Sequence, residues 1–444
     1  MNALVAPLLA VALASCAAYA ICAATSARAA GRFGDSTWVA PDRPVVTDSV
    51  AAGPRVAGRD HERRWETVLR TPFRVAFYPL HVLSNGVEGG MGVLGPRYLD
   101  PKPPHPPKLG RSLGPAIALG GVKDIGVGPA LTWAGMPPGH GRLHLSGTLS
   151  PIDHRTAHAS ATFGAGRPIG FRLGVDYDDR PDTRYFGIGN GTDDDRLAYY
   201  RLARTDVQAT MRLGASLRRQ LRIGGGYSAM RPGRGSHASP LLENVFTPAE
   251  APFAAQSTSD LWYGLAGDFA AVDELRNPSR GVHGRFDVRN AAGASRGDPG
   301  YFQWRLEGRG YLPVFAKRRV LALRAVYDGV DPGSDGTPGQ PFYRLATSED
   351  AGRFAGYSSG RFRDLQLIHT RLEYRWEIFH GASALALYDA GEVQPRTGLF
   401  RLGELHTSYG GGLRMGVSDI AVVRAEMAKS VEGLHAVLTL GGDF

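Results

Sequence analysis

The chain has 444 residues with a formal net charge of +9, and 21% of its residues are charged. A mean hydropathy of −0.20 excludes a bundle of transmembrane helices but is compatible with a membrane β-barrel, in which only alternate residues face lipid. No nucleic-acid-binding motif accompanies the basic charge, so we expect outer-membrane lipids and lipopolysaccharide, not nucleic acid, to meet it.

Residues 1–29 are predicted to be a secretory signal peptide. Ala3–Thr25 is a run of mostly small, apolar residues, and Ala27–Ala29 offers an A-x-A cleavage site. No Lys or Arg precedes the run, and two alternatives remain: an uncleaved transmembrane helix and a lipoprotein acylated at Cys16. Alanine-rich runs insert weakly and the apolar residues continue past Cys16, so the signal peptide is favoured. Both cysteines of the chain lie in this leader, which leaves the mature chain without thiols.

Residues 30–110 are predicted to be a periplasmic linker. The segment begins polar and aperiodic, and 101–107 is a proline-rich, extended spacer. Between them, residues 65–83 carry a helical stripe of apolar side chains, which Pro72 and Pro79 break into short amphipathic pieces. This helix could dock on the barrel rim, lie at the membrane interface or enter the lumen. A packing helix without a gating role fits the pattern equally well.

From residue 111 to residue 444 the sequence predicts an all-β fold, a transmembrane antiparallel β-barrel of about sixteen strands. Turns rich in glycine, proline, aspartate and asparagine separate segments in which polar and apolar residues alternate. An even number of strands is what a single-chain bacterial barrel requires. The expected strands lie near 113–121, 126–134, 141–150, 155–164, 169–178, 198–214, 217–229, 259–271, 280–291, 300–313, 317–328, 363–378, 381–391, 404–416, 419–428 and 433–444.

The alternation is clear in the segment 368–378. One face is apolar and consists of Ile368, Leu372, Tyr374, Trp376 and Ile378, with Thr370 as a mild exception. The interleaved face is ionic and consists of His369, Arg371, Glu373, Arg375 and Glu377. A barrel in the outer membrane needs both faces, because lipid lies on one side of its wall and a polar lumen on the other.

The last strand ends the chain in the same pattern. Leu438, Leu440 and Phe444 share one face, and Phe444 is the terminal residue. A terminal aromatic residue on an alternating strand resembles the signal that the barrel-assembly machinery recognises, so these residues are the predicted assembly signal. Gly441 and Gly442 indicate weak pairing between the last strand and the first.

Three long connectors, at 179–197, 230–258 and 329–362, interrupt the strands. Each follows an odd-numbered strand, so all three are expected to open on the extracellular side.

The barrel region, roughly residues 111–444, resembles the BamA/TamA superfamily, also called the bacterial surface antigen family. The segments PFYRL (341–345), GRFAGYSSGRFRD (352–364), EYRW (373–376) and LYDAG (387–391) occur in that family's order. YFGIGNG (185–191) and DELRNPSRG (273–281) resemble two further recurring pieces. The resemblance implies a sixteen-stranded barrel in the bacterial outer membrane whose connector 329–362 folds back into the lumen as a lid loop.

The resemblance also implies a lock between the lid loop and the barrel wall. In the family, an Arg at the loop tip pairs with an Asp of the wall. Here the tip is Phe354-Ala355-Gly356-Tyr357, with Ala355 in place of the Arg, whereas Asp389 and Gly391 of the wall motif are present. The remaining predicted residues of the loop motif are Gly360, Arg361, Arg363 and Asp364.

A lumenal carboxylate without a cation would be costly, so a substitute for the missing Arg is expected. Arg353, Arg361 and Arg363 are the candidates, with Arg363 as the first choice. The alternative is that Asp389 simply faces lumenal water.

Residues 31–110 lack the strand and helix pattern of a POTRA domain, so the chain is predicted to be a barrel-only member. The function favoured by the resemblance is assistance in inserting or translocating proteins, or lipid, at the outer membrane. A gated passive pore and a structural barrel that docks a periplasmic partner are the alternatives.

No enzyme motif is found. The histidines His140, His144, His154 and His158 are better explained as strand-end residues than as metal ligands, so neither a metal nor a cofactor is expected.

Overall fold

The computed structural model describes residues 110–441 except 122–123, 137–140, 217, 276, 315–318, 334–338, 350–353, 380–381, 396–400 and 417–421. The predicted signal peptide, the linker with its amphipathic helix, and Phe444 therefore lie outside the described residues. No helix within the described ranges has the length and hydrophobicity needed to cross a bilayer.

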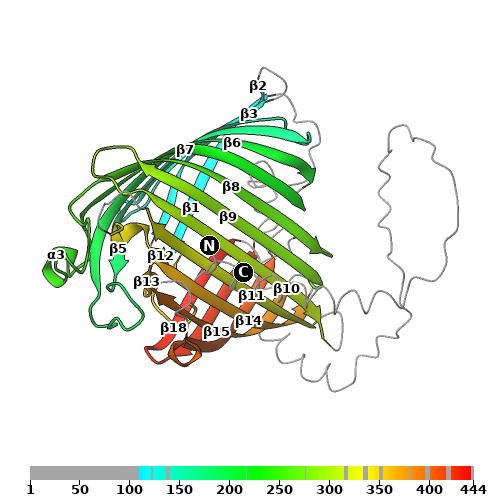
Figure 1. Cartoon of the computed structure of the whole chain (residues 1–444). Helices are drawn as coiled ribbons and strands as arrows, with labels where there is room; N and C mark the ends of the chain where they lie inside the picture. Colours follow the sequence, from blue (N-terminus) through cyan, green and yellow to red (C-terminus); the bar gives the residue numbers. More distant parts are fainter. Residues whose placement is uncertain are drawn as a thin grey trace, which may run out of the picture.

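Sixteen strands form one antiparallel sheet in which neighbours along the chain are also neighbours in the sheet (Figure 1). Their bounds are β1 Gly110–Gly121, β2 Asp124–Met136, β3 Gly141–Leu149, β4 Arg155–Phe163, β5 Ile169–Tyr185, β6 Ala198–Ser216, β7 Arg219–Arg234, β8 Thr258–Val272, β9 Gly281–Gly293, β10 Tyr301–Pro313, β11 Arg319–Pro332, β14 Gln366–Phe379, β15 Ala382–Gln394, β16 His406–Gly416, β17 Val422–Ser430 and β18 Gly433–Gly441. Each of these strands overlaps a predicted one, so the all-β prediction is confirmed.

The remaining elements lie in the connectors between these strands. The short helix α3 (Leu242–Val245) lies between β7 and β8. The connector after β11 contains a 3-10 turn, Phe342–Arg344, and a two-stranded sheet of β12 (Ala346–Thr347) and β13 (Arg363–Asp364). The connectors after β5 and β7 are shorter than predicted, because these strands run on to Tyr185 and Arg234. A second 3-10 turn, Leu402–Glu404, precedes β16.

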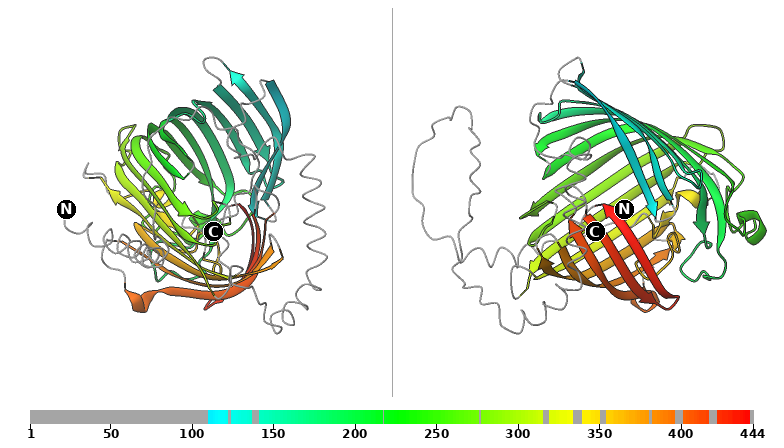
Figure 2. Two further views of the ribbon diagram at one scale, coloured as in Figure 1. Left: turned by 90° about the vertical axis from the view of Figure 1, so that its right-hand side faces the viewer. Right: turned by 180° about the vertical axis from the view of Figure 1, so that it is seen from behind.

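The sheet curls on itself, so that the first and last strands approach each other (Figure 2). Hydrogen-bonded pairing is continuous from β1 to β18, but the described residues of these two strands do not pair with each other. Among the described residues, the wall thus has one seam, between β1 and β18, across which the backbone groups of the two strands are not hydrogen-bonded to each other.

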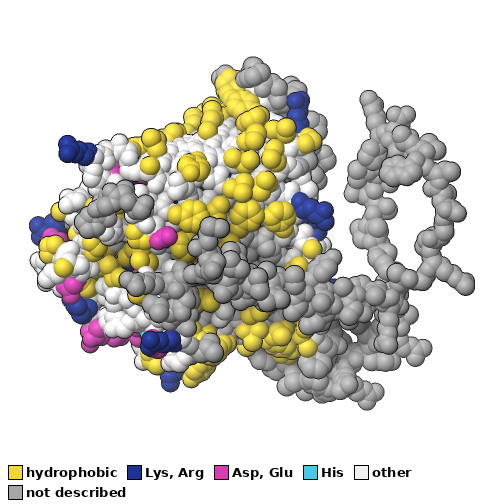
Figure 3. Space-filling view, in the orientation of Figure 1, with side chains coloured by type: hydrophobic (Ala, Val, Ile, Leu, Met, Phe, Trp, Pro, Cys, Tyr) yellow, Lys and Arg dark blue, Asp and Glu magenta, His cyan; other side chains and the backbone are white. Residues whose placement is uncertain are grey.

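The two faces of the wall differ as an outer-membrane barrel requires. On β5, Phe171, Leu173, Val175 and Tyr177 are all exposed on the outer face, with Leu173 at 55%. Figure 3 shows hydrophobic side chains spread over the outside of the strands. A soluble protein rarely exposes an apolar surface of this extent, whereas lipid would cover it.

The alternation predicted for β14 is confirmed over most of its length. Arg371, Glu373 and Arg375 are buried on the inner face, and Leu372 is 41% exposed on the outer face. Ile378 departs from the prediction because it is buried. The register between β14 and β15 shifts between Glu377 and Phe379, and a bulge of this kind redirects the side chains that follow it.

The outer face offers a direct test through Leu323, which is 48% exposed and lies opposite Leu372 in the β11–β14 pair. We expect Leu323→Arg to reduce the free energy of unfolding, because the charge must be buried in lipid. The expected loss is about 2–4 kcal/mol, the range for an Arg that faces lipid at the bilayer midplane. The measurement is urea unfolding from lipid vesicles, with Leu323→Ala as the control for lost side-chain volume. Equal losses for the two variants would contradict a lipid-facing position.

Candidate functional site

The connector 333–365 is the lid loop, and its described parts are packed against the inner wall. It begins later than the predicted 329 because β11 extends to Pro332. Phe354, Tyr357 and Phe362 of the loop form one buried cluster, whose other members include Leu367 and Val393 of the wall. Figure 1 shows β12 and β13 near the end of the barrel that carries α3. The described parts of the loop thus lie against the wall strands.

The tip of the lid loop is bound to the wall through its backbone. The Ala355 N–H donates to Asp389 Oδ2 at 3.0 Å, and the Gly356 carbonyl accepts from the Ser430 hydroxyl at 2.6 Å. The Tyr357 hydroxyl donates to the Thr407 carbonyl at 3.1 Å. These bonds attach the tip to β15, β16 and β17.

Glycine is needed at two of the predicted positions for steric reasons. A Cβ at Gly356 would lie 2.5 Å from the Ser408 Cβ, and a Cβ at Gly391 would lie 2.4 Å from both the Phe354 ring and the Ile368 carbonyl oxygen. Phe354 in turn packs against His369, with ring centroids 4.4 Å apart. The close approach of loop and wall therefore requires that positions 356 and 391 have no side chain.

The cation that pairs with Asp389 is Arg371, from the neighbouring strand of the wall. Arg371 Nε lies 2.7 Å from Asp389 Oδ1 and Nη2 lies 2.8 Å from Oδ2, and both residues are at most 6% exposed. The two residues are directly opposite each other in the β14–β15 register. His369 Nε2 lies 3.3 Å from the same Oδ1.

The prediction that Arg361 or Arg363 replaces the loop-tip Arg is therefore corrected, and Arg353 lies outside the described residues. A planar guanidinium directly across the strand pair satisfies both carboxylate oxygens without a contribution from the loop side chains. The alternative that Asp389 faces lumenal water is also wrong, because its side chain is fully buried.

Arg361 connects the lid loop to the connector after β5 and to the turn between β17 and β18. Its Nε lies 2.6 Å from Glu432 Oε1, and its other nitrogens donate to the hydroxyl and carbonyl oxygens of Thr192 at 2.5 Å. Burial raises the pKa of the Glu432 carboxyl, although the charge of Arg361 opposes this.

Arg363 and Asp364 hold the end of the loop. Arg363 donates to the Phe342 carbonyl at 3.0 Å, and its own carbonyl accepts from the Gly189 N–H at 2.8 Å. This second bond joins the lid loop to the YFGIGNG segment. The Asp364 side chain accepts the Leu365 N–H at 2.8 Å, and Gly360 turns the chain with a φ of +72°.

The start of the lid loop is also fixed by a buried ion pair. Arg344 Nη2 lies 2.5 Å from Asp260 Oδ2 on β8, and both side chains are almost fully buried. Tyr343 donates to the Gln256 carbonyl at 2.8 Å, which adds the connector between β7 and β8 to the contacts.

The Asp389–Arg371 pair belongs to a larger charge network along the inner wall. Arg371 Nη1 lies 3.2 Å from Glu426 on β17, and Arg424 Nε lies 2.8 Å from the same residue. Arg424 also contacts Glu373 on β14, which pairs with Arg375 at 2.8 Å. We call this set, with Asp389, the wall network.

The intervening strand β16 leaves room for the network. In the register of β16 between β15 and β17, its inner positions opposite Leu387 and Leu385 are Gly410 and Gly412. No side chain stands there between the charges of β14 and those of β17. Sequence reasoning recognised the ionic face of β14 but missed its link to Asp389, Arg424 and Glu426, because that link depends on strand register.

Other predicted positions have no part in this site. Leu438 is 49% exposed on β18, whereas the side chain of Leu440 lies outside the described set. His154 and His158 are bonded to Asp178 and Asp176, respectively. No group of three metal-ligating side chains occurs in the part of the chain that the structure describes.

An apolar outer face, a polar inner face and a lid loop bound inside the wall define an outer-membrane β-barrel protein. Residues 161–433 match the model of the Omp85 superfamily domain, and the chain belongs to this superfamily. Its place is accordingly the bacterial outer membrane.

The solved structures that resemble the chain include the following three. BamA from Haemophilus ducreyi lacking POTRA domains 1–3 is 14% identical with a TM-score of 0.56, and the match covers 74% of this chain and 70% of that one. CdiB from Acinetobacter baumannii is 11% identical, with a TM-score of 0.44 and coverage of 74% and 59%. CdiB from Escherichia coli is 11% identical, with a TM-score of 0.43 and coverage of 75% and 60%.

At these identities the likeness to BamA shows the fold alone, and the chain spans less than two thirds of either CdiB structure. No curated protein matches the sequence.

The geometry predicts that the lid loop depends on Asp389. We expect Asp389→Ala to cost about 3 kcal/mol in unfolding free energy, because Arg371 loses its bidentate partner and the Ala355 N–H its acceptor. Limited proteolysis of the folded barrel should then cleave the lid loop faster. Asp268→Ala is the matched control, since Asp268 forms a partly exposed pair with His283 at 2.8 Å. Unchanged cleavage in Asp389→Ala would contradict the lock.

Proposed function

We propose that this protein assists the insertion or translocation of polypeptides at the outer membrane, and that the lid loop controls the process. Membership of the Omp85 superfamily supports the general role. The observation that carries the more specific proposal is the Ala355–Asp389 bond, because it joins the lid loop to a charge network that ends on β17.

The position of β17 connects the lock to the seam. β17 pairs with β18, and β18 is one of the two strands that flank the seam. Unpaired strand edges present backbone donors and acceptors that can pair with another strand. In the proposed mechanism, release of the lid loop removes a restraint from this part of the wall, and an incoming polypeptide strand pairs with a free edge.

Lipid is the second proposed cargo, and a periplasmic protein that delivers the client is a proposed partner. The barrel's own insertion is proposed to depend on the barrel-assembly machinery, through Leu438, Leu440 and Phe444. These roles rest on the sequence pattern of the last strand and on the family.

A gated pore is the second candidate function. A cavity of about 380 Å³ on the lumenal side of β5–β9, lined by polar, glycine and some apolar residues, favours it, because solute needs such space inside the wall. Here the lid loop would act as the gate.

The test is depletion of the protein followed by quantitative proteomics of the outer membrane and measurement of surface lipid. We expect selective loss of one barrel or surface protein, or of surface lipid. Wild type and Asp268→Ala should restore it, whereas Asp389→Ala should not, at equal amounts of folded barrel. An unchanged outer membrane would contradict the assembly role. Planar-bilayer conductance would then test the pore, which requires Asp389→Ala to conduct more than wild type.

A further inference from the structure

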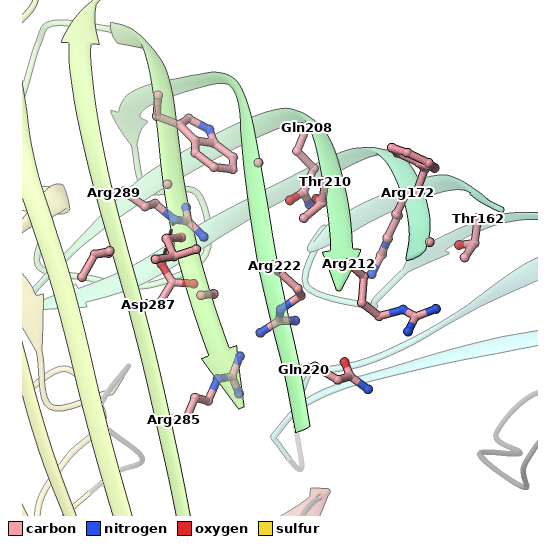
Figure 4. A pocket seen from close by; sticks show the side chains of 18 of the residues that line it. Thr162, Arg172, Gln208, Thr210, Arg212, Gln220, Arg222, Arg285, Asp287 and Arg289 are labelled. Atoms are coloured by element: carbon pink, nitrogen blue, oxygen red, sulfur yellow. Dashed lines mark hydrogen bonds and ion pairs between the residues drawn. The ribbon is translucent and has the colours of Figure 1, made fainter. Parts of the chain in front are cut away.

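The lumenal wall formed by β5–β9 differs in charge from the wall network on β14–β17. Its cavity of about 380 Å³ is lined by arginines from four different strands. They are Arg172 on β5, Arg212 on β6, Arg222 on β7, and Arg285 and Arg289 on β9. Figure 4 shows these side chains around the cavity, and we call this site the arginine pocket.

Among the described residues, three of these arginines have no hydrogen-bonded or ion-paired partner, and the Asp268 carboxylate acts on Arg222 and Arg285 only at longer range. In the described ranges, Arg172, Arg222 and Arg285 form neither an ion pair within 4.0 Å nor a side-chain hydrogen bond. Arg212 is held by backbone carbonyls, including those of Gly164 at 3.0 Å and Arg167 at 3.2 Å. These carbonyl oxygens orient the guanidinium of Arg212, but they carry no net charge and so do not neutralise it.

The carboxylates near the pocket are engaged elsewhere. Asp287, which lines the pocket, lies 3.1 Å from Arg289. Asp268 is opposite Arg285 in the β8–β9 register but bonds to His283 at 2.8 Å. Asp176 of β5 is bonded to His158. The positive charge of the pocket therefore exceeds the negative charge within it.

The strand register brings like charges together. Arg212 and Arg222 are directly opposite each other in the β6–β7 pair, an arrangement that destabilises a sheet. The adjacent row contains Gly224 opposite Gly264 on β8, which leaves two positions without a side chain of their own, flanked by Thr210 and Arg289. A repulsive pair beside these glycines is expected where a bound anion offsets the repulsion.

We propose that the arginine pocket binds a phosphate-bearing anion. A phosphate monoester carries up to two negative charges in one compact group, and guanidinium groups contact its oxygens in bidentate geometry. The cavity volume is within the range of roughly 300–1,000 Å³ typical of small-molecule sites. A singly charged carboxylate would leave more of the arginine charge unbalanced.

The N-terminal segment of this chain is a poor alternative occupant. Residues 30–109 contain 11 Lys and Arg against 8 Asp and Glu. A segment with excess positive charge would add to the repulsion in the pocket. The phosphate group therefore comes from outside the chain, either in a soluble phosphate ester or in the headgroup of an anionic lipid.

The experiment uses the full barrel in nanodiscs of zwitterionic lipid, titrated with inorganic pyrophosphate by calorimetry. We expect saturable binding that weakens about tenfold or more in the double variant Arg172→Gln/Arg222→Gln. Without pyrophosphate at low salt, the same variant should melt at an equal or higher temperature than wild type, because repulsion is relieved. A merely structural role for these arginines predicts the opposite, a lower melting temperature.

The matched control is Arg231→Gln/Arg296→Gln, which removes the same charge from two exposed positions outside the pocket. It should bind pyrophosphate as wild type does. An equal loss in both double variants, or no saturable binding to wild type, would overturn the proposal.

A second arm identifies the source of the phosphate. Nanodiscs that also contain phosphatidic acid should compete with pyrophosphate in wild type, and less in Arg172→Gln/Arg222→Gln, if a lipid headgroup is the ligand. Unchanged pyrophosphate affinity in these discs assigns the site to a soluble phosphate ester.

Discussion

The Asp389 carboxylate is fully buried inside the barrel, and a buried charge is stable only when an opposite charge and hydrogen bonds surround it. Arg371 supplies the charge, and His369 and the Ala355 N–H complete the environment. The lid loop thus contributes a backbone donor where a loop arginine was expected. The lid loop can therefore stay bound with Ala355 at its tip. Arg371 of the wall supplies the cation that pairs with Asp389, and the tip contributes a backbone N–H.

The wall network extends this dependence across the last strands. Glu426 and Arg424 on β17 share partners with β14, and the glycines of β16 allow the contacts to form. Charges on three strands are therefore balanced by one another. Contacts run from the lid tip to Asp389, then to Arg371 and Glu426 on β17, the strand that precedes β18. The route consists of direct contacts, and it ends beside the unpaired seam.

The opposite side of the lumen follows a different arrangement. Along β5–β9, Arg212 is opposite Arg222 in the strand register, and the arginines of the pocket outnumber the carboxylates that line it. The lid loop is bound both to the β14–β17 side, at Asp389, and to β8, through the Arg344–Asp260 pair. The excess positive charge of the arginine pocket fits a lumen that binds an anion there.

Much of the fold follows from the sequence by itself. Period-two alternation, turn residues and connector lengths predicted the sixteen strands and the long connector after β11, because lipid and water impose opposite demands on adjacent residues of a strand. The ionic face of β14 was also predicted from the sequence. The partner of Asp389 was not predicted, because the resemblance directed attention to the arginines of the loop motif, although Arg371 is only 18 residues from Asp389 along the chain. Only the register of β14 against β15, and the two glycines Gly410 and Gly412 on the inner face of β16, decided which charges meet. Such pairing joins residues that are separated in sequence and lie opposite one another only after the strands have aligned.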